Sequence, residues 1–242
     1  MIQEQLDVLA FGPHPDDVEL GCGGTLAKLA GMGYATGIID LTRGEMGTRG
    51  TVAEREREAA DAAQILGARL RENLAIPDAD IRNTPENRRK LIDAVRKYRP
   101  ALVFAPNHDD RHPDHRHAAQ LITEACFYAG VEKIAPGPYD AFRPRRVIYY
   151  MITYEFEPSF LVDISAQYPQ KLAAIKAHRS QFYNPAYPGR ETFISSPEYL
   201  EAVEFRMRHY GWKAGVKYAE PLRVREAILL DDLFTALAGN KM

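Results

Sequence analysis

Two short polar segments of this sequence contain the side-chain types that bind divalent metal ions in proteins. The first, Pro13–Glu19, reads Pro-His-Pro-Asp-Asp-Val-Glu, and the second, His112–His115, reads His-Pro-Asp-His. Histidine nitrogen and carboxylate oxygen are common zinc ligands, and a catalytic zinc site combines three protein ligands with an open position for water. His14 and Asp17 are three residues apart, so a tight turn can direct both side chains to one ion. The second segment is the expected source of the third ligand.

Asp16 and Cys22 lie beside this predicted site without being needed as ligands. Zinc lowers the pKa of a bound water to about 7, and a neighbouring carboxylate can accept a proton from that water. Asp16 adjoins Asp17 but points differently, so it is free to act as a general base. Cys22 follows shortly after Asp17, and we expect it to be a small buried residue. A single His-Asp turn usually indicates an Asx turn or a helix cap, but two such proline-containing segments indicate a metal site.

Both polar segments follow predicted strands. Short apolar runs alternate with longer amphipathic runs along the first half of the chain, a pattern typical of βα units around a parallel sheet. Leu6–Gly12 is such a run before the first segment, and Ala101–Ala105 precedes the second. Open α/β sheets bind ligands at the carboxyl ends of their strands. The sequence therefore predicts an α/β, Rossmann-like fold with a mostly parallel sheet, helices on both faces and the active site at the strand carboxyl ends.

Further strands and helices are predicted within a single domain that spans residues 1–242. The other strand candidates are Ala35–Thr42, Leu70–Ile76, Arg146–Ile152, Phe160–Ile164 and Val216–Val224. Helices are expected near Thr25–Gly33, from Thr51 to Gly67, from Thr84 to Tyr98, over Ala118–Ala129 and Pro169–Phe182, and from Ser196 onward. Thr51 with Glu54 fits a capping box, and Thr84 before Pro85 is a typical helix start.

The composition is that of an ordinary globular protein, with 45% hydrophobic and 26% charged residues in a chain of 242. The net charge of −2 includes no block of like charges, which argues against nucleic acid or an anionic membrane as a partner. No apolar run approaches the roughly 20 residues that cross a bilayer, and no signal-peptide pattern is visible. Cys22 and Cys126 are too few for a disulfide framework. We therefore expect a cytoplasmic protein.

The two polar segments together resemble the paired signature of the LmbE-like (PIG-L) N-acetylglucosamine deacetylase family. Asp40–Glu45, Gly50 and Thr51 with Arg55, and Tyr218–Glu220 are similar to one branch of that family. This branch deacetylates N-acetylglucosaminyl malate in bacillithiol synthesis. The resemblance extends over nearly the whole chain, and it implies an N-deacetylase with one Zn²⁺ per chain that acts on a small amino-sugar substrate.

The resemblance also implies a role for each polar residue of the two segments. It assigns zinc binding to His14, Asp17 and His115. Asp16 becomes the general base that deprotonates the water. His112 would be the protonated group that stabilises the tetrahedral oxyanion and assists departure of the amine. Asp114 would orient His112 or stabilise its charge.

Substrate contacts are implied for Arg55, Tyr199 and Arg146, and Arg111 is a further candidate because it flanks the second segment. A malyl group carries two carboxylates, and arginine pairs with a carboxylate through two parallel hydrogen bonds. The three arginines are therefore the candidates for recognising malate. From the residues alone, Arg55 and Arg111 could equally be solvated surface residues.

Other functions are compatible with the same residues. A related deacetylase could act on another amino sugar, such as a chitin oligomer or a mycothiol precursor. Two histidines and a carboxylate also form the facial triad of non-haem iron oxygenases, although these usually have β-rich barrels. A non-catalytic metal-binding protein would have a closed coordination sphere. The resemblance further implies a homo-oligomer, either a trimer or a hexamer.

Overall fold

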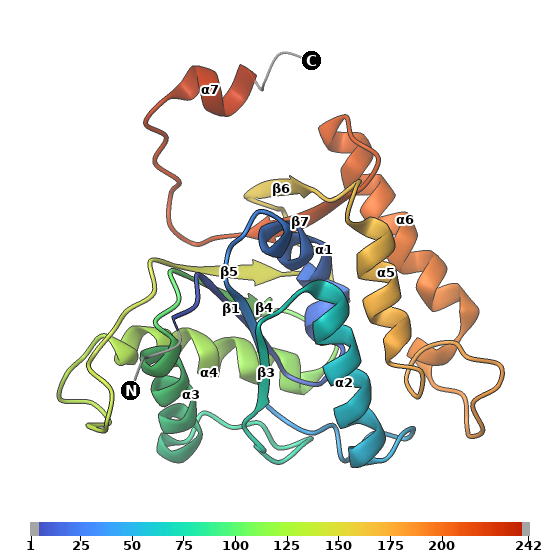
Figure 1. Cartoon of the computed structure of the whole chain (residues 1–242), viewed down its shortest axis with the longest axis horizontal. Helices are drawn as coiled ribbons and strands as arrows, with labels where there is room; N and C mark the ends of the chain where they lie inside the picture. Colours follow the sequence, from blue (N-terminus) through green and yellow to red (C-terminus); the bar gives the residue numbers. More distant parts are fainter. Residues whose placement is uncertain (1–4, 239–242) are drawn as a thin grey trace.

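The described residues of the computed structural model, 5–238, form a seven-stranded sheet of order β3-β2-β1-β4-β5-β7-β6 (Figure 1). The strands are β1 (Val8–Gly12), β2 (Thr36–Asp40), β3 (Leu70–Asn73), β4 (Leu102–Pro106), β5 (Arg146–Tyr150), β6 (Phe160–Asp163) and β7 (Ala219–Arg223). The first five strands pair in parallel, whereas β7 is antiparallel to β5 and β6. The predicted mostly parallel sheet is confirmed. That residues 1–242 form a single domain stays a prediction.

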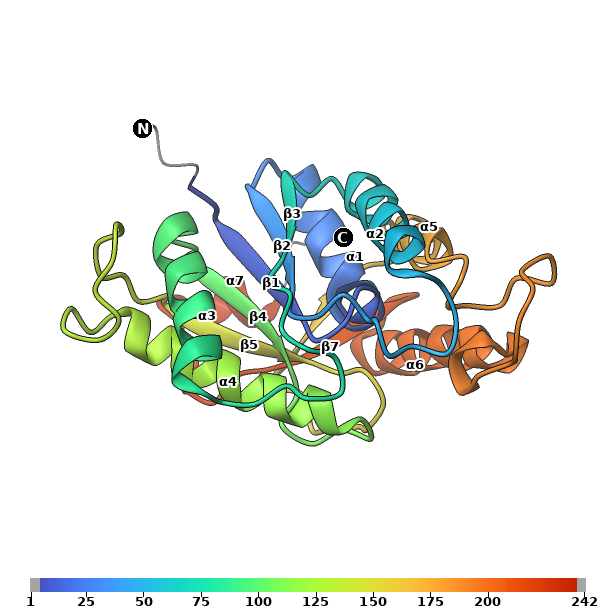
Figure 2. The same ribbon diagram turned by 90° about the horizontal axis from the view of Figure 1, so that it is seen from below.

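Helices cover both faces of the sheet, as predicted (Figure 2). One face carries α3 (Pro85–Tyr98) and α4 (Pro113–Ala129); the other carries α1 (Asp17–Gly31), α2 (Val52–Leu66) and α5 (Tyr168–Ala177), while α6 (Pro197–Ala214) packs against β7. Successive side chains of a strand point to opposite faces, so β1 contributes to two cores. Leu9 and Phe11 pack with α3 and α4, and Val8 and Ala10 pack with α1 and α2.

Two helices begin earlier than the sequence predicts, and both differences concern the polar segments. α1 begins at Asp17, not near Thr25, and α4 begins at Pro113, not near Ala118. Asp17 and Glu19 lie in the first turn of α1, and Asp114 and His115 lie in the first turn of α4, where unpaired backbone N–H groups donate to anionic and polar partners. The amphipathic pattern starts only after that turn, which is why it places both helix starts too late. The predicted caps at Thr51 and Thr84 are present.

The chain after β7 adds a short helix that the sequence pattern does not predict, α7 (Leu233–Ala238). Figure 1 shows it separated from the sheet, and Leu233 and Phe234 are exposed. Within residues 5–238, no helix is both long and apolar enough to span a membrane. A cytoplasmic location stays a prediction.

The helix α1 is interrupted at Cys22, and a buried ion pair from distant parts of the chain supplies hydrogen-bond partners at the break. Cys22, which is fully buried as expected, has non-helical angles (φ −141°, ψ 16°). Beyond the break, the backbone N–H groups of Gly24 and Thr25 donate to the two carboxylate oxygens of Glu220, at 2.9 and 2.7 Å. Glu220 on β7 thus caps the second half of α1, as an anion does at a helix N-terminus.

Lys171 on α5 forms the ion pair with Glu220 and binds the half of α1 that precedes the break. Its Nζ donates to Leu20 O at 2.8 Å and to Glu220 Oε1 at 2.6 Å. Leu20 O would be the partner of the Gly24 N–H in an unbroken helix, so the ion pair supplies a partner to each of these two groups. The first half of α1, which begins at Asp17, is therefore held in place by β7 and α5.

Replacing Lys171 with methionine should strongly destabilise the protein. Removal of one partner leaves Glu220 as an uncompensated buried charge, which costs about 3–5 kcal/mol. Chemical denaturation measures the change. Lys176→Met is the matched control, because Lys176 is exposed on the same helix, and its effect should stay within about 0.5 kcal/mol. Equal unfolding midpoints for the two variants would refute the assigned role of the ion pair.

Candidate metal centre and active site

The two polar segments meet at the carboxyl edge of the sheet. β1 and β4 are parallel neighbours, so the segments that follow them emerge side by side. The ring centroids of His14 and His115 lie 5.4 Å apart. A cavity of about 500 Å³ opens at this point, and the predicted site residues among its lining are His14, Asp16, Asp17, Arg55, Arg111, His112, His115 and Tyr199.

His14, Asp17 and His115 form a compact group of possible metal ligands. Asp17 Oδ2 lies 3.1 Å from His14 Nδ1 and 3.3 Å from His115 Nε2. One ligand atom from each of the three buried residues lies within 4.8 Å of the others. His14, His112 and Asp114 form a second group that meets the same distance limit. The arrangement can therefore hold a divalent cation between two imidazoles and a carboxylate.

The second ring nitrogen of each histidine in the first group faces a further carboxylate. His115 Nδ1 lies 2.9 Å from Asp110 Oδ1. His14 Nε2 lies 3.1 Å from Asp78 Oδ1 and 3.7 Å from Asp114 Oδ2. Carboxylates commonly hold metal-binding histidines in this way, because the hydrogen bond fixes the tautomer and the ring orientation. Sequence reasoning missed Asp78 and Asp110, although Asp110 lies just before the second segment.

Charge interactions within this group move the pKa values of its members far from ordinary ones. Burial opposes the charged form of His14, but hydrogen bonds to Asp114, Asp17 and Asp78 outweigh it and raise the His14 pKa well above 6.5. Burial is likewise outweighed at His115, where Asp17 and Asp110 raise the pKa to about 9. The two imidazoles in turn hold the pKa of Asp17 well below its usual range, despite its burial. The cluster favours positive charge between its carboxylates.

Asp16 occupies a strained position beside the ligand group. Its φ of 135° and ψ of −23° are unfavourable for a residue with a side chain. Such strain persists only where the surroundings enforce it, and it is frequent in active sites. Burial raises the pKa of Asp16 to about 6, partly opposed by Arg55. A carboxylate with a raised pKa is suited to accepting a proton near neutral pH.

Arg55 holds Asp16 in this position. Its Nη2 donates to Pro15 O at 2.9 Å and to Asp16 Oδ2 at 3.3 Å, and its Nη1 donates to Gly44 O at 3.0 Å. Gly44 has a φ of 65°, and a Cβ there would lie 1.8 Å from Arg55 Nη1. Only glycine therefore allows the guanidinium to pack against this loop. Arg55 is buried in the cavity wall, not solvated, and its predicted contact with substrate stays a prediction.

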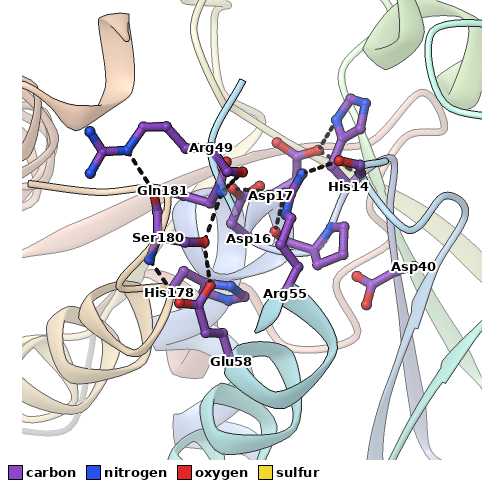
Figure 3. A network of polar contacts seen from close by, with 12 residues as sticks. His14, Asp16, Asp17, Asp40, Arg49, Arg55, Glu58, His178, Ser180 and Gln181 are labelled. Atoms are coloured by element: carbon purple, nitrogen blue, oxygen red, sulfur yellow. Dashed lines mark hydrogen bonds and ion pairs between the residues drawn. The ribbon is translucent and has the colours of Figure 1, made fainter. Parts of the chain in front are cut away.

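A second set of hydrogen bonds fixes the loop before α2 to the chain that follows α5 (Figure 3). Arg49 Nε donates to Ser180 O at 2.7 Å, and Gln181 Nε2 donates to Arg49 O at 2.6 Å. Ser180 donates from its backbone N and its hydroxyl to Glu58 on α2, both at 2.7 Å. Gln181 also lines the cavity. These contacts hold two walls of the cavity together.

His112 and Asp114 are both at the start of α4, but their contact differs from the expected one. His112 is the N-cap residue of α4, and its Nδ1 accepts a hydrogen bond from the backbone N of Asp114 at 3.2 Å. The Asp114 carboxylate faces His14. Burial, and the neighbouring His14 and His115, lower the His112 pKa, which opposes a protonated resting state. The roles of His112 as the acid and of Asp114 as its orienting group stay predictions.

The remaining substrate-binding candidates are divided between the two edges of the sheet. Tyr199 lies in the cavity wall beside Phe193, with ring centroids 5.4 Å apart. Arg111 is exposed at the cavity, with its guanidinium carbon 4.3 Å from the centre of the Phe193 ring. Arg146 is the first residue of β5, which is parallel to β4. It therefore lies at the opposite, amino edge of the sheet, and the prediction that it contacts substrate in this cavity is not supported.

The fold and the site together define a class of protein. It is an α/β protein with a His-Asp-His group of possible metal ligands at the carboxyl edge of its sheet and a further carboxylate beside that group. Residues 9–126 match the PIG-L family, described as GlcNAc-PI de-N-acetylase. Diacetylchitobiose deacetylase of Thermococcus kodakarensis is 33% identical over 92% of this chain and 84% of that protein. This chain belongs to the PIG-L (LmbE-like) family.

Other relatives have more varied names. A protein of Bacillus anthracis named probable N-acetyl-α-D-glucosaminyl L-malate deacetylase 2 is 29% identical over 75% of this chain and 84% of its own length. The 4-oxalmesaconate hydratase of Pseudomonas putida is 30% identical over 73% of this chain and 74% of its own length. Most of these relatives are deacetylases of N-acetylated sugars, but the family is not limited to one reaction.

Solved structures share the fold. A conserved protein of Thermus thermophilus is 46% identical with a TM-score of 0.86, over 95% of this chain and 99% of that chain. The N,N′-diacetylchitobiose deacetylase of Pyrococcus horikoshii, in complex with an inhibitor, is 30% identical with a TM-score of 0.79, over 90% and 82% respectively. The predicted fold and family are confirmed.

Replacing His115 with glutamine should abolish stoichiometric metal binding. The variant lacks one of the three ligands, so the affinity should fall by more than the roughly 10–100-fold typical of changes to residues behind the ligands. Metal content after dialysis, measured by elemental analysis, tests this. His117→Gln is the control, since His117 is exposed two residues further along α4, and it should retain the metal. Full metal content in His115→Gln would exclude His115 as a ligand.

Proposed function

We propose that this protein is a zinc-dependent deacetylase that hydrolyses the N-acetyl group of an N-acetylglucosaminide and releases acetate and the free amine. The observation that carries the proposal is Asp16, a buried carboxylate beside a His-Asp-His ligand group within one cavity. Metal-assisted amide hydrolysis needs these two components next to each other, a cation to polarise the carbonyl and a base to activate water.

The ligand atoms fit zinc. Two imidazole nitrogens and one carboxylate oxygen are a donor set of catalytic zinc sites, which leave a position open. Both imidazoles also have a carboxylate behind them, as zinc-binding histidines usually do. Zinc bound here would polarise the amide carbonyl and lower the pKa of water.

The residues around the ligands supply proton transfer and charge stabilisation. Asp16 would accept the proton of the attacking water, with Arg55 holding its carboxylate through Nη2. The Nδ1 of His112 is occupied by the Asp114 backbone N–H, so its Nε2 is the nitrogen that can serve the substrate. From there His112 would donate a hydrogen bond to the carbonyl oxygen as negative charge develops, the role of an oxyanion donor. The proton that the departing amine needs is the one that Asp16 takes from the water, and His112 can pass it on as the general acid only as the imidazolium, in which Nδ1 no longer accepts from the Asp114 amide.

The aglycone of the substrate is the finer part of the proposal. We favour N-acetylglucosaminyl malate, which would make this a bacillithiol-biosynthesis enzyme, because Arg111 presents an exposed guanidinium at the cavity. The likeness to diacetylchitobiose deacetylase supports a neutral second sugar as the alternative. Phe193 beside Arg111 is 58% exposed and offers that sugar an apolar surface. A homo-oligomer, trimer or hexamer, stays a prediction.

Asp16→Asn should retain zinc and lose most of its turnover. Asparagine has nearly the same shape as aspartate, so the side chain can keep its place while the base is lost, and general-base catalysis contributes about 10²–10⁴-fold. Steady-state acetate release, with zinc content measured in parallel, tests this. Asp80→Asn, at an exposed carboxylate, is the control. Near-normal kcat in Asp16→Asn would remove Asp16 from the base role.

Zinc-loaded protein should release acetate from N-acetylglucosaminyl malate more efficiently than from diacetylchitobiose or free N-acetylglucosamine. If Arg111 binds malate, Arg111→Gln should raise KM for the malate conjugate roughly 10–100-fold, since a hydrogen bond to a charged group contributes about 1.5–3 kcal/mol. KM for neutral diacetylchitobiose should not change, and Arg116→Gln, at an exposed neighbour, is the control variant.

The outcomes separate the competing functions. Equal effects of Arg111→Gln on both substrates would exclude carboxylate recognition by Arg111. If the protein prefers diacetylchitobiose, the aglycone of its substrate is a second sugar and not malate. Absence of acetate from all three amides, together with hydration of an unsaturated carboxylic acid, would place the protein with its hydratase relative and refute the deacetylase proposal.

A further inference from the structure

Asp110 is a buried carboxylate that the family resemblance does not assign to any role. It lies in the loop between β4 and α4, and only 3% of its surface is exposed. Its neighbour Asp109 is exposed. A carboxylate withdrawn from water needs compensating hydrogen bonds, so the partners of Asp110 indicate what it does.

Every polar contact that the structure gives Asp110 involves a nitrogen. Oδ1 accepts from the backbone N of His112 at 3.2 Å and lies 2.9 Å from His115 Nδ1. Oδ2 accepts from the backbone N of Thr153 at 2.9 Å and of Tyr154 at 3.4 Å. Thr153 and Tyr154 follow β5, and Thr153 lines the cavity. One carboxylate therefore connects α4, which carries His115, to the chain after β5 in the cavity wall.

This environment determines which nitrogen of His115 carries the proton. Backbone amides can only donate, and an ionised carboxylate can only accept. With three amides donating to Asp110, the remaining contact is satisfied only if His115 Nδ1 carries a proton and donates it. The lone pair of the neutral ring is then on Nε2, the atom that lies 3.3 Å from Asp17 Oδ2.

We infer that Asp110 is a positioning residue for the metal, one that fixes His115 in the Nδ1–H tautomer and presents Nε2 as the ligand atom. The inference rests on the metal site of the proposed function. It differs from a purely structural role, in which Asp110 would only tie the loop after β4 to the chain after β5 and would not influence the affinity of the folded protein for metal.

An amide cannot replace this carboxylate. In Asp110→Asn one carboxylate oxygen becomes an NH₂ group. This group must face either His115 Nδ1 and the His112 amide, or the backbone amides of Thr153 and Tyr154. Turned toward His115, the NH₂ group favours the other tautomer; turned toward the other amides, it breaks the link to the cavity wall. Both orientations weaken the hold on the imidazole.

Zinc affinity provides the test. Full-length Asp110→Asn and Asp109→Asn are titrated with zinc in competition with a chromophoric chelator, and unfolding of the metal-free proteins is recorded in parallel. Asp110→Asn should bind zinc about 10–100-fold more weakly, as expected for loss of a carboxylate behind a ligand, whereas Asp109→Asn should match the parent. Unchanged affinity in folded Asp110→Asn would overturn the inference, even if its stability falls.

A second measurement needs no variant of Asp110. In zinc-loaded protein labelled with ¹⁵N-histidine, the His115 ring, assigned by comparison with His115→Gln, should carry its proton on Nδ1. A proton on Nε2 would overturn the inference whether or not Asp110→Asn folds. Neither test uses a substrate, so failure of acetate release would refute the proposed reaction and leave the role of Asp110 standing.

Discussion

The parallel pairing of β1 with β4 is the constraint on which the site depends. Val8, Leu9 and Ala10 pair with Leu102, Val103 and Phe104, so two segments about a hundred residues apart in the sequence leave the sheet at the same edge. A short loop leads from each strand into a helix, and the polar residues lie at the end of that loop and in the first turn of the helix. Any other strand between β1 and β4 would move His14 away from His115 and separate the candidate ligands.

Charged groups gathered in one buried cavity need compensating hydrogen bonds and ion pairs, and each of them has such contacts. Asp17 lies between two imidazoles, and Asp78 and Asp110 each accept several N–H groups. With carboxylates on several sides, His14 and His115 take up protons more readily than ordinary histidines. A divalent cation would displace those protons, because metal ligation requires neutral imidazole. The negative charge of the carboxylates around His14 and His115 is thus balanced either by protons on the imidazoles or by a metal ion.

The parts of the structure that could be predicted are those encoded locally. Apolar runs indicated the strands, Thr51 and Thr84 marked helix starts, and the two polar segments pointed to a metal site. Asp78 could not be found in this way, because its contact with His14 joins loops that only the folded sheet brings together. The expectation that Arg146 contacts substrate could have been questioned from the sequence, since a residue that begins a strand parallel to β4 lies at the edge opposite the site. Periodicity also misplaced the helix starts, because ligands and caps interrupt the amphipathic pattern.

The site also depends on residues that never contact it. Asp17 begins α1, and α1 breaks five residues later at Cys22. Without Glu220 and Lys171, the groups exposed by the break would lack partners, and the first turn of α1 would lose its fixed relation to the rest of the helix. Glu220 comes from the antiparallel part of the sheet and Lys171 from α5, both in the second half of the chain. The candidate ligands come from the first half, but their rigidity requires both halves, so the candidate metal centre cannot be understood as a property of the two polar segments alone.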